Sequence, residues 1–120
     1  MTGKKVINRF KFHLLIVWTI FILFLTLMPV PDIGIETENY YDKIVHLFLF
    51  GIFSYLLYLN LSFSRLKRVA TTIFVSVIFS IIIEFFQYFV PGRNPSYLDF
   101  WAGFVGVLMF IIVPYVKDKK

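Results

Sequence analysis

Residues 69–90 read VATTIFVSVIFSIIIEFFQYFV, which is the third of four long apolar stretches in the chain. It is long enough to cross a bilayer as a helix, which takes about 20 apolar residues. Its one charged side chain, Glu84, lies near its carboxy end, with Ser80 before it and Gln87 after it at helical spacing. Polar groups that faced lipid would lack hydrogen-bond partners, so we predict that this stripe faces other helices of a bundle.

The rest of the chain predicts three further membrane helices. Hydrophobic residues make up 59% of the sequence and charged residues only 16%, whereas charged residues are near a quarter of an ordinary soluble domain. Proline, glycine and charged clusters separate the apolar runs. We therefore predict an all-α, membrane-spanning four-helix bundle that forms one domain over residues 1–120. The expected helices are at about 12–30, 44–63, 69–90 and 97–116.

The distribution of lysine and arginine predicts the orientation, because basic residues in short loops stay in the cytoplasm. Both ends of the chain are basic, and Arg65, Lys67 and Arg68 are expected to form a tight basic turn between the second and third helices. The first loop, in contrast, is acidic. We therefore predict that both termini are cytoplasmic and that the polar ends of the helices face outward. Aromatic residues predict a belt at that outer interface: Tyr40, Tyr41, Tyr88, Tyr97 and Trp101.

Composition also limits the chemistry and the partners. The sequence has no cysteine, which excludes disulfides, thiolate metal sites and a cysteine nucleophile. The formal net charge of +5 comes from short basic clusters beside apolar spans, and anionic lipid headgroups are simpler partners for such clusters than nucleic acid. We expect membrane lipids as partners, no nucleic acid, and a multi-pass protein of the membrane.

Three helices carry polar residues at the ends that should meet on the outer side. On the second helix, Asp42, Lys43 and His46 share one edge at helical spacing. A carboxylate one turn from an imidazole can orient the ring and raise its basicity, as in an acid/base pair. The alternatives are that Asp42 caps the helix amino terminus and that His46 is a structural histidine.

Glu84 and the loop that follows it supply the rest of this polar cluster. We expect Glu84 to lie about 9 Å from the end of its helix, because six residues at a rise of about 1.5 Å each separate it from residue 90. An ionisable group at such depth is a functional-site hypothesis by default, and the alternative is an interhelical clamp to His46 or Arg93. Arg93 and Asp99 flank the last loop, with Ser96 between them. A guanidinium can bind phosphate through two parallel hydrogen bonds, or it can form ion pairs with the carboxylates.

Small residues predict where the helices approach most closely. Small side chains let two helix backbones come together, so we expect the face beneath Asp99 to pack inward, with a hollow on the second helix opposite it. The packing residues are Gly51 on the second helix and Ala102, Gly103 and Gly106 on the fourth, with Ser54 beside Gly51.

These segments together resemble the VanZ-like family of small bacterial membrane proteins. The resemblance is carried by Asp42-Lys43-Ile44-Val45-His46 with Phe50-Gly51, by Glu84-Phe85-Phe86-Gln87, by Arg93-Asn94-Pro95-Ser96-Tyr97-Leu98-Asp99, and by Gly106. One position departs from the family pattern, because Gly103 stands where the family usually has asparagine. The resemblance implies a multi-pass protein of the bacterial plasma membrane, about four helices, and a link to the founding member's role in teicoplanin resistance.

Three functions fit these residues. The first is binding of an anionic cell-envelope group, such as a lipid-linked wall precursor, by Lys43, Gln87, Arg93, Ser96 and Asp99. The second is a membrane-embedded hydrolase or transferase in which His46 or Glu84 is the general base and Asp42 orients the histidine. The third is a structural network in a protein that binds other membrane proteins. His46, Glu84 and Asp99 offer donors that suit a divalent ion, but they follow no recognised ligand spacing, so we expect no metal and no cofactor.

Overall fold

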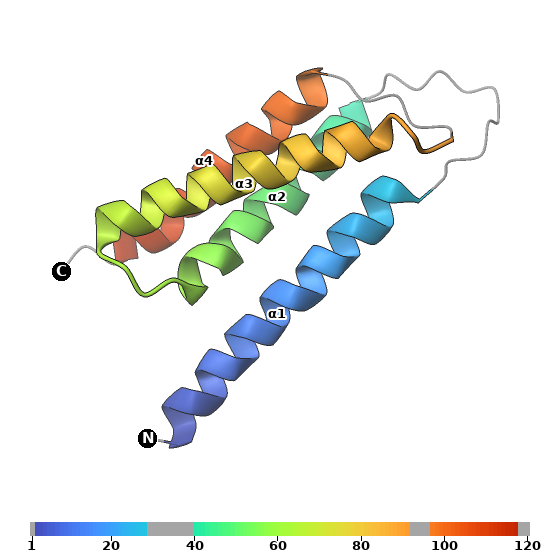
Figure 1. Ribbon diagram of the computed structural model, residues 1–120. Coiled ribbons are helices and arrows are strands. Elements are labelled where there is room, and N and C mark those ends of the chain that lie inside the picture. The colour runs from blue at the N-terminus through green and yellow to red at the C-terminus, as the bar shows by residue number, and fades with distance from the viewer. Residues whose placement is uncertain (1, 29–39, 92–96, 118–120) are drawn as a thin grey trace.

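The computed structural model describes the backbone of residues 2–28, 40–91 and 97–117 and the side chains of residues 9–28, 43–91 and 97–117. All regular structure in these residues is helical (Figure 1). The four helices are α1 (Thr2–Leu27), α2 (Tyr40–Asn60), α3 (Arg65–Gln87) and α4 (Tyr97–Lys117). Each is long and apolar enough to cross a membrane. The predicted fold class, an all-α bundle of four spans, is confirmed.

The helix bounds differ from the predicted ones where charged residues join a helix. α1 begins at Thr2, ten residues before the predicted start, because lysine and arginine are good helix formers. The predicted basic turn is wrong: the chain turns at 61–64, and Arg65, Lys67 and Arg68 form the first turn of α3. The guanidinium of Arg65 lies 3.7 Å from the centre of the Tyr115 ring, so this end of α3 is tied to α4.

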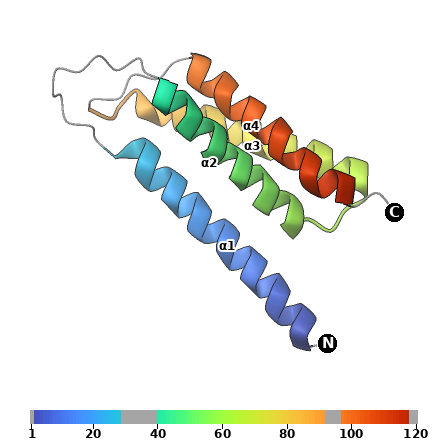
Figure 2. The same cartoon turned by 180° about the vertical axis from the view of Figure 1, so that it is seen from behind.

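Both α2 and α3 contact each of the other three helices, and α2 has the larger total contact. The contact of α2 with α4 is the most extensive, and the two lie side by side in both views (Figures 1 and 2). α3 covers one side of this pair, while α1 diverges from the bundle toward its amino end. The apolar core lies between the helices and consists of Ile22, Leu49, Phe50, Phe53, Ile83 and Val107.

Glycine residues lie at the contact between α2 and α4. At Gly106 the two backbones are so close that an added Cβ would collide with the backbone carbonyl group of Leu47. Gly51 faces the same contact, where a Cβ would meet the Phe110 ring. Ser54 donates a 2.7 Å hydrogen bond to the Gly51 carbonyl and lies 3.4 Å from the Val107 carbonyl of α4.

Two side chains attach α1 to the other helices. The Trp18 indole nitrogen donates a 2.8 Å hydrogen bond to the Leu49 carbonyl of α2. The Gln87 amide nitrogen donates a 2.9 Å hydrogen bond to the Thr26 carbonyl in the last turn of α1, where a helix leaves its carbonyl groups without helical partners. Gln87 is therefore the cap that joins the carboxy ends of α1 and α3.

Candidate functional site

Three polar side chains from three helices meet at one end of the bundle. His46 of α2, Glu84 of α3 and Asp99 of α4 each place a nitrogen or oxygen atom so that the three atoms lie within 4.8 Å of one another. His46 Nε2 lies 3.5 Å from Glu84 Oε1. The start of α2, the end of α3 and the start of α4 share this end because the helices alternate in direction (Figure 1). The meeting predicted from the sequence is thus observed for these three residues, which we call the polar triad.

Lys43 adds a positive charge at the edge of the triad. Its Nζ lies 3.9 Å from Asp99 Oδ1, a separation longer than a hydrogen bond. The Lys43 side chain is 24% exposed and the Asp99 side chain 10%. With His46 neutral, the described side chains of this cluster carry one positive and two negative charges. Two carboxylates therefore lie beside one ammonium group in a largely dehydrated place, where a charged group needs a partner.

The side chains of the triad are largely buried, and His46 packs on an aromatic ring. His46 is 5% exposed and its ring stacks on Phe50 at a centroid distance of 5.9 Å. Phe50 also lies against Gly103, where an added Cβ would be 3.0 Å from the Phe50 ring. The ring thus stands where a side chain at position 103 would project. Ser80, one turn before Glu84, is buried as predicted.

Glu84 lies nearer the helix end than the sequence suggested. α3 ends at Gln87, not at residue 90, so Glu84 is about 4.5 Å from that end instead of about 9 Å. Its side chain is 15% exposed. Its Oε1 atom is nevertheless buried and accepts no hydrogen bond from the described residues. A buried carboxylate oxygen in this state points to an interaction beyond the hydrogen bonds of the described residues.

Several predicted site residues stand apart from the triad or outside the described residues. Gln87 is 3% exposed, and its amide nitrogen is engaged by α1 rather than directed to the carboxylates. Arg93, Ser96 and the side chain of Asp42 lie outside the described residues, and α2 already begins at Tyr40.

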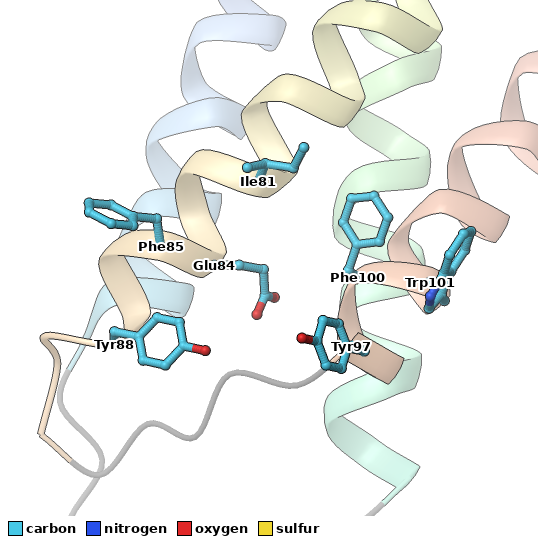
Figure 3. Close-up of a pocket in the computed structure, with 7 residues that line it drawn as sticks. All are labelled: Ile81, Glu84, Phe85, Tyr88, Tyr97, Phe100 and Trp101. Carbon is cyan, nitrogen blue, oxygen red and sulfur yellow. The ribbon is translucent and has the colours of Figure 1, made fainter.

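A pocket of about 480 Å³ lies between α3 and α4 beside the triad. In Figure 3 the Glu84 carboxylate projects into this space, and the Tyr88 and Tyr97 hydroxyl groups point toward each other from opposite helices. The lining residues are Ile81, Glu84, Phe85, Tyr88, Tyr97, Phe100 and Trp101.

Sequence reasoning missed this pocket. It assigned Tyr88, Tyr97 and Trp101 to an interfacial belt and gave no role to Ile81, Phe85 and Phe100. The available signal was that aromatic residues flank Glu84 on one helix and Asp99 on the next.

The site combines an imidazole, two carboxylates and an ammonium group with a mostly aromatic pocket. This arrangement can bind a cation at the carboxylates, accept hydrogen bonds from a ligand, and hold an apolar group between α3 and α4. The fold and site define an integral membrane protein, a bundle of four membrane-spanning helices with a buried polar triad near one end.

The family model described as VanZ/LLP1 matches residues 5–117, and this chain belongs to that family. A search of curated proteins found no match, and neither did a search of solved structures.

Proposed function

We propose that this end of the bundle binds an amphipathic lipid of the bacterial cell envelope through its anionic headgroup, in the plasma membrane and from the outer side. The observation that carries the proposal is that the 480 Å³ pocket and the charged cluster share Glu84. A ligand with an apolar part and a polar head would occupy both at once.

The pocket has the size and lining of a small-molecule site. Such sites usually have volumes of about 300–1,000 Å³ and apolar or aromatic walls with a few polar groups. Tyr88 is 74% exposed and Tyr97 88% exposed. Their hydroxyl groups can donate hydrogen bonds to phosphate or sugar oxygens at the membrane surface.

The basic and acidic residues have different roles in the proposed site. Lys43, together with Arg93 and Ser96 of the last loop, would contact the anion, because a charge-assisted hydrogen bond to phosphate is strong. Glu84 and Asp99 would repel an anion in direct contact. We therefore assign them to orienting Lys43 and to accepting hydrogen bonds from hydroxyl or amide groups of the ligand.

A binding experiment in nanodiscs of zwitterionic lipid tests the proposal. A Trp18→Phe variant leaves Trp101, in the pocket wall, as the only tryptophan, and its fluorescence reports binding of an added polyprenyl phosphate. We expect saturable binding that Lys43→Met weakens about tenfold, which equals about 1.4 kcal/mol. Lys67→Met is the matched control, because Lys67 lies in the first turn of α3, at the end of the bundle away from the site. This variant should leave binding unchanged.

The same samples separate the proposal from its alternatives. Equal binding of the polyprenol without its phosphate would contradict anion recognition, and the absence of saturable binding would contradict the lipid site. Recovery of a dephosphorylated product would favour the hydrolase alternative.

The family relationship motivates a test in cells. We propose that the protein contributes to teicoplanin resistance by occupying an envelope lipid. Expression should raise the teicoplanin concentration that inhibits growth, Lys43→Met should abolish the effect, and Lys67→Met should preserve it at equal protein level. Equal protection by both variants would argue against a role of the cluster in resistance.

A further inference from the structure

The polar triad has the donor set and the spacing of a divalent metal site. One imidazole nitrogen and two carboxylate oxygens come from three different helices and lie within 4.8 Å of one another. We propose that His46, Glu84 and Asp99 hold a divalent cation of the Zn²⁺ or Mn²⁺ class, for which nitrogen and oxygen donors are suitable. The sequence predicted no metal because the three ligands follow no recognised spacing, whereas the structure gives the separation of their donor atoms.

The observed distances are close to those that a bound ion requires. Two ligand atoms bonded at about 2.1 Å to a tetrahedral zinc ion are about 3.4 Å apart. His46 Nε2 and Glu84 Oε1 are 3.5 Å apart. The widest separation in the triad must close by no more than about 1.4 Å to reach zinc geometry, a change that rotation of a carboxylate can supply.

A second observation points to a ligand at this place. Glu84 Oε1 is buried and accepts no hydrogen bond from the described residues, which is costly for a carboxylate oxygen. A divalent ion bound to the triad would satisfy this oxygen.

The site would be open on one side. Glu84 belongs both to the triad and to the wall of the 480 Å³ pocket. Three protein ligands with a further position open toward a cavity are typical of metal sites that bind a ligand. The ion would add a positive charge beside the pocket, whose described lining residues include no lysine or arginine. This role in anion binding rests on the proposed function, whereas the metal site rests on the triad alone.

The competing interpretation is a closed network in which a protonated His46 pairs with the carboxylates and no metal binds. The two interpretations differ in what zinc alone does to the His46 ring. The sequence contains two histidines, and His13 lies on α1, where its Nδ1 is 2.6 Å from the Arg9 carbonyl. A His13→Ala variant therefore leaves His46 as the only histidine without changing any proposed ligand.

The experiment titrates ZnCl₂ into this variant after chelator treatment, with ¹⁵N-labelled histidine, in neutral nanodiscs. We expect one equivalent of zinc to bind by calorimetry and to shift the His46 ring nitrogen resonances. Glu84→Gln should lower zinc affinity at least tenfold, whereas Glu36→Gln, which removes the same charge outside the triad, should not.

Two results would overturn the proposal: His46 resonances that do not respond to zinc, or zinc binding that is unchanged by Glu84→Gln. The first result requires no substitution of a ligand, so it remains decisive if Glu84→Gln fails to fold. Binding of polyprenyl phosphate is measured separately with chelator present. Zinc binding without lipid binding would reject the proposed function alone, and lipid binding without zinc binding would reject the metal site alone.

Discussion

Gly106→Ala tests the closest contact in the bundle. A Cβ at this position would meet the carbonyl oxygen, the carbonyl carbon and the Cα of Leu47. All three are backbone atoms of α2, so no side-chain rotation can relieve the collision. The two helices must therefore separate at this contact.

The expected loss of stability follows from two opposing terms. Overpacking of a tight contact costs about 1–3 kcal/mol, and a backbone collision belongs at the upper end of this range. Replacing glycine by alanine within a helix recovers about 1 kcal/mol of helix propensity. We therefore expect Gly106→Ala to lower the free energy of unfolding by about 2 kcal/mol.

The measurement is unfolding of the purified protein by SDS in mild detergent micelles, followed by circular dichroism. Gly103→Ala is the matched control, because its Cβ would lie 3.0 Å from the Phe50 ring, a side chain that can shift. The control should change stability by less than about 1 kcal/mol, since the propensity gain offsets the mild crowding. Equal stability of Gly106→Ala and Gly103→Ala, or a Gly106→Ala variant as stable as the wild type, would refute the reasoning.

Three further substitutions test other contacts. Trp18→Phe removes the indole hydrogen bond from α1 to α2 and should cost about 0.6 kcal/mol, the average for such bonds in a membrane; unchanged SDS unfolding would contradict this. Gln87→Leu removes the donor to the Thr26 carbonyl and should cost about 1–3 kcal/mol, with faster hydrogen exchange in the last turn of α1; unchanged exchange would rule out the cap. Gly103→Asn should cost about 1–3 kcal/mol by crowding Phe50, and Phe50→Leu in the same chain should restore part of it; no recovery would mean that another contact causes the loss.

The local pattern in α3 predicted much of the fold but not its ends. Ser80 and Gln87 are buried, as their helical spacing indicated. Arg65, however, was assigned to a turn and begins the helix, because hydropathy locates the apolar part of a helix and does not register charged residues that extend it. The depth of Glu84 was overestimated for the same reason.

The amino-acid sequence alone determined that this chain forms membrane-spanning helices, how many there are, and which ends carry the polar residues. The length of an apolar stretch and the helical spacing of its polar residues are local properties, so both can be seen in a single sequence. Only the tertiary structure decided that His46 lies 3.5 Å from Glu84, that Gln87 caps α1, and that a pocket lies beside them. These features depend on the rotation and separation of helices distant in the chain, which are set by contacts such as that of Gly106 with the Leu47 backbone.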